Sequence, residues 1–146
     1  MLRQLSLFLE NRPGQLRAPC EALGKAGVDI LTMSLADTAQ FGILRLIVRD
    51  WSRAKDVLEA SGAVVNVADV VPIEVDDRPG GLAAALAALE EAGVGVEYMY
   101  AFARGTRPGK AAIVFRFEDM ERAVAAVRAK GLRVLDAEEL LAAKAG

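Results

Sequence analysis

Two periods of apolar residues alternate along the chain, and together they predict a mixed α and β structure. Residues 2–9 alternate between apolar and polar positions, which is typical of a strand, and Leu16, Cys20 and Leu23 then recur at helical spacing. Gly27 is expected to end this helix because glycine adopts the left-handed conformation without steric cost. The same reasoning predicts an order βαββαβ for the first half, with strands at 28–37, 41–48 and 63–70 and a helix at 51–61.

The second half repeats this order. A strand at 71–76 is followed by a helix that Leu82 and Leu89 mark and that Gly93 closes. Asp136 and Glu139 form a capping-box-like start to a short C-terminal helix. The remaining pattern predicts strands at 94–103, 111–117 and 132–136 and a helix at 120–130.

A direct repeat supports this duplication. The segment ENRPGQLRAPCEALGKAGVDI at 10–30 returns as DDRPGGLAAALAALEEAGVGV at 76–96, so that Asn11 corresponds to Asp77. An internal repeat defines the architecture before other signals are considered. We therefore predict two α+β domains, at residues 1–70 and 71–146, that pack together because no flexible linker separates them.

Two prolines bear on the start of the first helix. Pro13 suits the first helical position, where its missing N–H would have no partner. Pro19 is expected inside the helix, where it removes the bond to the Gln15 carbonyl and costs about 3 kcal/mol or more. The second copy has Ala85 at this place, so the two helices are expected to differ here.

Several strands are apolar on both faces. Phe8 alternates with the leucines of the first strand, and Ile43 and Ile47 alternate with those of the third. Helices on one sheet face cover only one of these sets. We therefore expect self-association through the sheet, with a homodimer as the simplest assembly.

Composition excludes several classes of function. The 146 residues are 53% hydrophobic and 26% charged, which is typical of an ordered globular protein. The net charge of −2 offers no electrostatic footprint for nucleic acid or for anionic lipid. The sequence shows no membrane span and no signal peptide, and its single cysteine suits a reducing compartment, so a cytoplasmic protein is expected.

The absence of histidine argues against catalysis. The chain has no histidine and one cysteine, which removes the commonest general base and leaves no ligand set for structural zinc. Only Asp and Glu remain as candidate bases. We therefore expect no enzymatic activity, no metal and no cofactor.

A repeated turn carries the candidate chemistry. The turn that begins at Asn11 joins a strand to a helix N-terminus, and Asp77 begins its second copy. The first N–H groups of a helix lack internal partners, so a carboxylate or phosphate binds well there. The alternative is that Asn11 and Asp77 only cap their helices. A third Arg-Pro-Gly, at residues 107–109, is read as an exposed hairpin turn.

ENRPGQL followed by AGVDI resembles the first half of an ACT domain, the βαββαβ regulatory module of amino-acid metabolism. The resemblance covers both halves and implies a stand-alone tandem ACT protein with two ferredoxin-like domains, each with an antiparallel sheet and helices on one face. It also implies that an amino acid binds between two side-by-side ACT units. The strand–helix loop of one unit then holds the ligand, helped by a residue at the start of the second strand of the other.

Carried over to this chain, the resemblance implies two unequal sites. Asn11 would face the region of Gly95, and Asp77 would face Asp29. We favour the Asn11 site, because two nearby carboxylates repel a carboxylate ligand. The candidate ligand-binding residues are Asn11, Arg12, Pro13, Gly14, Gln15, Leu16, Asp29, Ile30, Asp77, Arg78, Pro79, Gly80, Gly81, Leu82, Tyr98 and Met99.

Tyr98 and Tyr100 allow two interpretations. Alternation places both on one sheet face, with Met99 between them in sequence. They could line a pocket for an aromatic or large apolar ligand, which would suit the aromatic-acid and branched-chain metabolism that similar ACT proteins serve. The other interpretation is interface packing, where tyrosine is common.

Three functions stay open from the sequence. The first is a sensor that binds an amino acid or a related carboxylate and shifts its own assembly or the activity of a partner. The second is a regulatory subunit of a metabolic enzyme that acts mainly through protein–protein contact. The third and least favoured is an enzyme on a ferredoxin-like scaffold, since fold alone does not define function.

Overall fold

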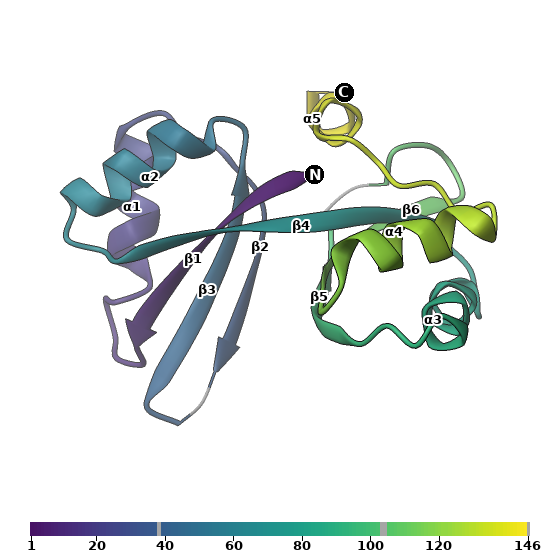
Figure 1. Cartoon of the computed structure of the whole chain (residues 1–146). Helices are drawn as coiled ribbons and strands as arrows, with labels where there is room; N and C mark the ends of the chain where they lie inside the picture. Colours follow the sequence, from purple (N-terminus) through teal and green to yellow (C-terminus); the bar gives the residue numbers. More distant parts are fainter. Residues whose placement is uncertain (38, 103–104, 146) are drawn as a thin grey trace. The chain divides into compact units, whose positions relative to one another are not determined.

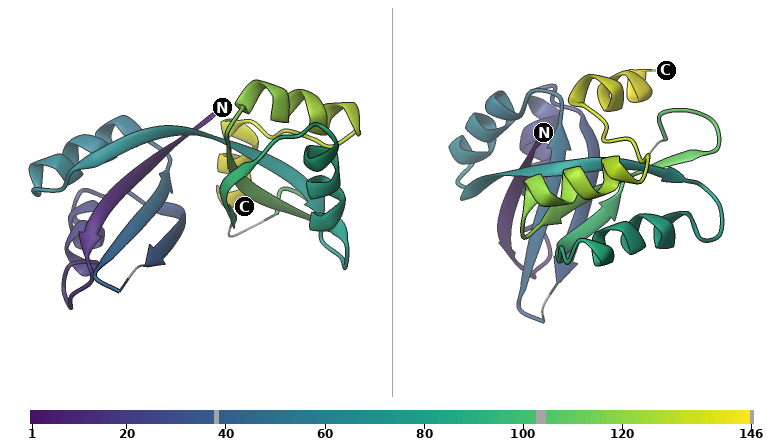
Figure 2. Two further views of the ribbon diagram at one scale, coloured as in Figure 1. Left: turned by 60° about the horizontal axis from the view of Figure 1, so that its bottom comes forward. Right: turned by 45° about the vertical axis from the view of Figure 1, so that its right-hand side comes forward.

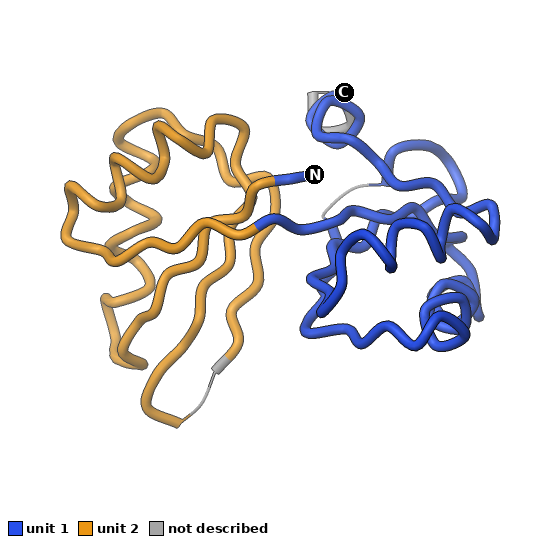
Figure 3. Tube along the Cα trace, viewed as in Figure 1, with its two compact units in different colours: residues 1–2, 69–146 blue, residues 3–68 orange. Residues whose placement is uncertain are grey.

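A computed structural model of the chain describes residues 1–37, 39–102 and 105–145. The chain forms two compact units (Figure 3). The N-terminal unit comprises residues 3–68, and the C-terminal unit comprises residues 1–2 and 69–146. None of the described helices is long and apolar enough to cross a membrane.

The N-terminal unit is a sheet with two helices on one face (Figures 1 and 2). Its strands have the order β2-β3-β1-β4, and β3 runs antiparallel to both of its neighbours. Leu7 of β1 pairs with Leu44 of β3, and both pack against Leu23 and Leu58 of the helices. The elements are β1 (Leu2–Glu10), α1 (Arg17–Lys25), β2 (Ile30–Asp37), β3 (Phe41–Val48), α2 (Trp51–Ala60) and the first part of β4 (Val65–Asp76).

The C-terminal unit repeats this arrangement. Its strands have the order β4-β6-β5, and the antiparallel pairs place Ile73, Phe115 and Phe117 against Leu89 of α3 and Val127 of α4. Both units are therefore ferredoxin-like, and the predicted fold class is confirmed. The elements are the second part of β4, α3 (Gly81–Glu91), β5 (Val96–Ala101), β6 (Lys110–Phe117), α4 (Met120–Ala129) and α5 (Ala137–Ala145).

The last helix begins with the predicted capping box. The Asp136 N–H donates to the Glu139 carboxylate at 3.0 Å, and the Glu139 N–H donates to the Asp136 carboxylate at 2.8 Å. This reciprocal pair satisfies two N–H groups that a helix start leaves without internal partners.

The expectations for the two prolines are corrected. The helix α1 begins at Arg17, so Pro13 lies in the preceding turn rather than at the first helical position. Pro19 falls in the first turn of α1, where an N–H has no internal partner, so it does not break the helix. Pro19 instead delays the start of α1, because it cannot donate to the Gln15 carbonyl. The equivalent helix α3, which has Ala85 there, begins two residues earlier in the repeat, at Gly81.

The expected strand at 132–136 is also corrected. It contributes one isolated bridge, between Val134 and Ile73. The Leu135 N–H donates to the Pro72 carbonyl at 2.9 Å, but Pro72 has no N–H with which to return the second bond of that pair. The proline therefore explains why the last strand of the second repeat is reduced.

Two further boundaries differ from expectation. The strands expected at 63–70 and 71–76 form one strand, β4, which spans Val65–Asp76. The strand expected at 94–103 is observed as β5, and Ala103 lies outside the described residues. No glycine lies within β4, and its β-branched residues favour an extended segment.

The tight start of α3 leads to a test with a matched pair of glycines. A Cβ at Gly81 would lie 1.9 Å from the Asp76 carbonyl oxygen, whereas a Cβ at Gly24 of α1 would meet nothing within 4 Å. We expect Gly81→Ala to lower the free energy of unfolding by about 1–3 kcal/mol through this clash. Gly24→Ala is expected to raise it by about 0.5–1 kcal/mol, because alanine is the better helix former. Urea unfolding followed by circular dichroism measures both, and equal stability of the two variants would contradict the close approach.

Candidate functional site

The two strand–helix loops share one backbone path. We call residues 11–16 loop 1 and residues 77–80 loop 2. Gly14 and Gly80 both have φ of 89°, a left-handed backbone conformation that residues other than glycine rarely adopt. The Ala18 N–H donates to the Gly14 carbonyl at 3.1 Å, and the Ala84 N–H donates to the Gly80 carbonyl at 3.0 Å. The glycine of each copy therefore sets the same entry into the following helix.

Each loop is tied to the hairpin of its own unit. The Asn11 N–H donates to the Gln40 carbonyl at 2.9 Å, and the Asp77 N–H donates to the Gly109 carbonyl at 3.0 Å. These bonds use the backbone, so they hold the loop in place whatever side chain stands at residue 11 or 77. The side chains at these positions are thus not needed to shape the loops.

Neither Asn11 nor Asp77 caps a helix. The N-cap residues are Leu16 for α1 and Gly80 for α3, and neither makes a side-chain capping bond. The Asn11 amide instead donates to the Ala39 carbonyl at 3.5 Å. The interpretation of both residues as plain helix caps is therefore wrong.

The helix starts offer donors to an anion. Among the described residues, the N–H groups of Leu16 and Leu82 have no hydrogen-bond acceptor. They lie at the positive end of a helix dipole, where a carboxylate is stabilised. A guanidinium is held beside each loop, because Arg12 pairs with Glu10 at 2.7 Å and Arg78 pairs with Asp76 at 3.2 Å. Both loops therefore combine backbone donors with one cation and one anion.

Loop 1 borders a small hollow of about 60 Å³. The hollow brings together three predicted residues, Asn11, Arg12 and Leu16. Liquid water takes about 30 Å³ a molecule, so this space holds a carboxylate or an ammonium group rather than a whole amino acid. Four lining residues were not predicted, Leu9, Glu10, Leu35 and Gly42. Leu9 and Glu10 directly precede the loop in sequence, whereas the strand register places Leu35 and Gly42 beside it.

Loop 2 is held more tightly. Gly81 lies against the Asp76 carbonyl so closely that a side chain there would clash, whereas Gln15 occupies the equivalent place in loop 1. Lys110 pairs with Asp76 at 2.5 Å. The hydrogen bond and the positive charge of Lys110 hold the pKa of Asp76 below its usual value, with a smaller contribution from Arg78. The Asp76 carboxylate thus stays ionised and engaged with Lys110 and Arg78. Asp77 adds a further carboxylate where loop 1 has the Asn11 amide, which disfavours a carboxylate ligand at loop 2.

Glu74 anchors the hairpin that supports loop 2, and the sequence analysis missed it. Its buried carboxylate accepts a hydrogen bond from Thr106 at 2.5 Å, pairs with Arg107 at 2.6 Å and lies 3.5 Å from the Arg133 guanidinium. Burial alone would raise the pKa of Glu74, but the bonds from Arg107 and Thr106 and the two positive charges lower it. Residues 107–109 form the predicted turn and also contribute this ion pair. Glu74 could have been found from the sequence, because it is an acidic residue within the apolar strand β4.

The strand-start positions differ between the copies. Asp29 directly precedes β2, which begins at Ile30, and the equivalent Gly95 directly precedes β5. A Cβ at Gly95 would lie 2.6 Å from Oε1 of Glu118, so the Glu118 carboxylate occupies the space that a side chain would fill. Sequence analysis found no polar group at this place. The assignment of residues 29 and 95 to opposite loops stays a prediction.

Tyr98 and Met99 lie on opposite faces of β5. Met99 pairs with Phe115, which belongs to the core under the helices, and its side chain is 41% exposed. Tyr98 pairs with Arg116 and is half-buried. Tyr100 pairs with Val114, which lies on the same face of β6 as Arg116. The two tyrosines therefore share the face away from the helices, and Met99 does not join them.

Other reactive groups offer little chemistry. Cys20 is half-buried, and burial raises the pKa of its thiol, which disfavours the nucleophilic thiolate. Within the described part of the chain, no group of His, Cys, Asp and Glu side chains could hold a metal ion.

Comparisons with known proteins agree with this geometry. The family model described as an ACT domain pair matches residues 1–143. The crystal structure of protein BT0572 from Bacteroides thetaiotaomicron is similar at 37% sequence identity and a TM-score of 0.87, over 95% of this chain and 94% of that one. The regulatory subunit of aspartate kinase from Thermus thermophilus, in its ligand-free form, has the same fold at 17% identity and a TM-score of 0.67, over 89% of this chain and 91% of that one. A search of the curated proteins found no match.

The ion pair at Glu74 predicts a dependence of stability on pH. Folding lowers the pKa of Glu74 below its unfolded value of about 4.3, so the pair stabilises the native state above that pH and the stabilisation is lost as the pH falls through the folded pKa. We expect Glu74→Gln to cost about 1–3 kcal/mol at neutral pH and progressively less in acid. Urea unfolding across the pH range measures this difference.

A double-mutant cycle with Arg107→Ala is the control for this prediction. The two single variants and the double variant should lose similar stability, because each removes the same contact. A difference between Glu74→Gln and the parent that does not change with pH would contradict the assignment.

Proposed function

We propose that this protein, which belongs to the ACT domain pair family, is a non-catalytic regulatory protein that binds an amino acid or a related small carboxylate at loop 1. The observation that carries the proposal is the hollow beside Asn11, Arg12 and Leu16, with a helix N-terminus at its edge. Binding at loop 1 would shift the assembly of the protein or the activity of a partner enzyme.

The groups at loop 1 suit both ends of an amino acid. The Leu16 N–H and the Arg12 guanidinium would hold the carboxylate, as unpaired donors at a helix start and an arginine commonly do. The Glu10 carboxylate would attract the ammonium, and the Asn11 amide can donate to one end or accept from the other. Leu35 and Leu16 add an apolar wall for a side chain.

A regulatory effect needs a difference in affinity between two states. The hollow at loop 1 is too small for a whole amino acid, so the ligand would also contact a neighbouring ACT unit. We propose that residues at a strand start complete the site, with Glu118 in the place of a side chain at Gly95. A ligand that bridges two units would favour the arrangement in which both contacts form. The similarity to a regulatory subunit of aspartate kinase supports a regulatory role.

The state of the acidic groups supports a non-catalytic role. A general base at neutral pH needs a raised carboxylate pKa. The two described acids with a resolved shift, Glu74 and Asp76, have lowered pKa values, because ion pairs and hydrogen bonds stabilise their charged forms. Both groups are thus engaged in structure.

A second candidate is a regulatory subunit that acts through contact with a partner enzyme or a second copy. Exposed apolar side chains of the N-terminal unit favour it. Phe8 is 62% exposed and stacks on Phe41 with ring centroids 5.1 Å apart, and Met33 and Leu35 on the edge strand β2 are 52% and 50% exposed. Side chains of this kind are typical of interaction surfaces.

A thermal-shift screen against amino acids, aromatic acids and branched-chain keto acids tests the proposal. A ligand at about 100 times its Kd should add about 2.7 kcal/mol of stability, and each kcal/mol raises Tm by roughly 2–4 °C. We expect Asn11→Ala to abolish the shift, because it removes the amide at the hollow. Asp77→Ala, the equivalent change in loop 2, is the matched control and should keep it.

Two other outcomes would redirect the proposal. A shift that Asp77→Ala abolishes and Asn11→Ala keeps would move the ligand to loop 2. The absence of a shift with every compound would favour the contact-only subunit, for which sedimentation of the parent and of Phe8→Ser would measure self-association.

A further inference from the structure

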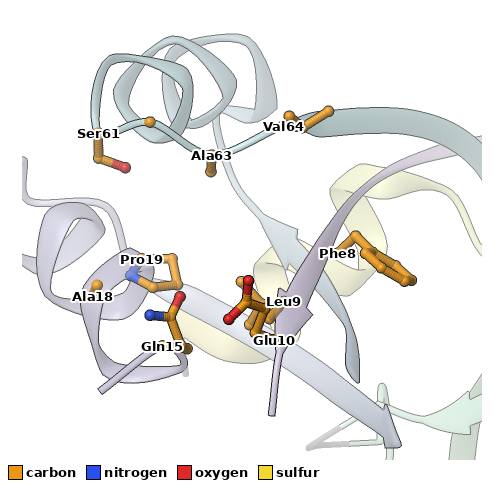
Figure 4. A pocket seen from close by; sticks show the side chains of 10 residues that line it. Phe8, Leu9, Glu10, Gln15, Ala18, Pro19, Ser61, Ala63 and Val64 are labelled. Atoms are coloured by element: carbon orange, nitrogen blue, oxygen red, sulfur yellow. The ribbon is translucent and has the colours of Figure 1, made fainter. Parts of the chain in front are cut away.

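A second cavity lies in the N-terminal unit and shares Leu9 and Glu10 with the loop 1 hollow. Its volume is about 280 Å³, close to the lower limit of roughly 300 Å³ for small-molecule sites. Three segments line it: the end of β1, the start of α1 and the turn between α2 and β4 (Figure 4). All of them belong to residues 3–68, so the shape of the cavity depends on this unit alone. We call it the Glu10 pocket.

Most polar groups of the Glu10 pocket are acceptors, and the Gln15 amide offers both an acceptor and donors. Figure 4 shows the Glu10 carboxylate and the Gln15 amide side by side below the turn, with the Ser61 hydroxyl across from them. The Ser61 hydroxyl donates to the Leu58 carbonyl at 2.7 Å, so it offers only lone pairs to a ligand. Arg12 pairs with Oε2 of Glu10 at 2.7 Å, and the Glu10 side chain is 55% exposed.

The backbone around the Glu10 pocket has the same polarity. The N–H groups of Gly62 and Ala63 are used within the turn, at 3.0 Å to the Glu59 carbonyl and 3.1 Å to the Leu58 carbonyl. The C-terminal end of α2, which borders the pocket, carries the negative end of the helix dipole. No lysine or arginine is among the lining residues. The pocket therefore favours a cation over an anion.

Small apolar groups form the rest of the wall. Pro19 is buried, and Ala18 and Ala63 add short side chains. A ligand that fits these walls has a compact apolar body attached to its positive charge. A primary ammonium suits the acceptors because it has three donors and no acceptor.

The C-terminal unit has a cavity of about 340 Å³ at the equivalent place, with a different lining. At the equivalent positions, Lys130 replaces Ser61 and Leu132 replaces Ala63. Leu132 packs against the hydrophobic core, and Lys130 pairs with Glu91 at 2.8 Å. Both copies of the repeat thus have a cavity at this place, but only the one in the C-terminal unit carries a cation of the chain, Lys130, in its lining.

We propose that the Glu10 pocket binds a small primary ammonium compound with a short apolar chain. The ammonium would lie between the Glu10 carboxylate and the Ser61 oxygen, and the chain would lie against Pro19 and Ala63. This site shares Glu10 with the one proposed at loop 1 but differs from it in the rest of its lining, because Asn11, Arg12 and Leu16 do not line it.

Titration of the ¹⁵N-labelled full chain with three probes of equal chain length tests the site. The probes are n-butylammonium, n-butanol and n-butyrate, each followed by NMR at neutral pH. We expect saturable amide shifts at Ala18, Gly62 and Ala63 with butylammonium, at least about tenfold weaker binding of butanol, and none of butyrate, because only the cation satisfies the acceptors.

Variants separate the pocket from non-specific effects. Ala63→Leu enlarges a side chain that lines the pocket, and it should abolish binding by occupying the space proposed for the apolar chain of the ligand. Ala129→Leu is the matched control on the end of α4 and should bind as the parent does. Glu10→Gln should weaken binding about tenfold, equivalent to 1.4 kcal/mol, without a change in volume.

Three results would overturn the proposal. These are no saturable shifts with butylammonium, equal shifts with butanol, or binding that Ala63→Leu retains. Asn11→Ala should leave butylammonium binding unchanged, so the failure of this proposal is distinguishable from the failure of the loop 1 site. If Ala63→Leu does not fold, Glu10→Gln still decides whether the carboxylate takes part.

Discussion

The burial of one apolar sheet face beneath two helices determines where the other parts of each unit lie. In the N-terminal unit, Leu7 and Leu44 form a cross-strand pair that packs against Leu23 and Leu58. Both helices must pack on this apolar face. The loop that joins a strand to the following helix is therefore constrained in the same way in each unit. The matching φ of 89° at Gly14 and Gly80 reflects this constraint. A loop held in this way presents a helix N-terminus, and the site chemistry starts from that geometry.

Duplication preserved the backbone and let the chemistry of the two loops diverge. In the C-terminal unit, Lys110 neutralises Asp76, and the hairpin that carries Arg107 is fixed to buried Glu74. Charges engaged in this way are less available to a ligand. In the N-terminal unit, Gln15 replaces the tightly packed glycine of the second copy, and Glu10 lines both the pocket and the hollow. The two copies therefore have one fold and different capacities for binding.

The prolines show where sequence reasoning reaches its limit. The loss of the N–H of Pro19 was visible from its identity, but its effect depended on where α1 begins, and the structure places it in a turn that tolerates it. Pro72 affected a strand more than sixty residues away, because its missing donor faces Leu135. In both cases the sequence showed that the proline lacks an N–H, but it did not show which part of the structure that loss would affect. The candidate site shows the same division: Asn11, Arg12 and Leu16 were predicted from a local motif, whereas Leu35 and Gly42 were not.

The sequence by itself determined the order of the elements, the duplication, the fold class and the two strand–helix loops. These features follow from periodicity and turn chemistry, which act between residues close together in the chain. Only the tertiary structure decided that Arg107 meets Glu74, that Glu118 fills the space beside Gly95, and that Glu10 faces a cavity. Such contacts join residues far apart in sequence, and they exist only once strand register and helix packing have brought their side chains together.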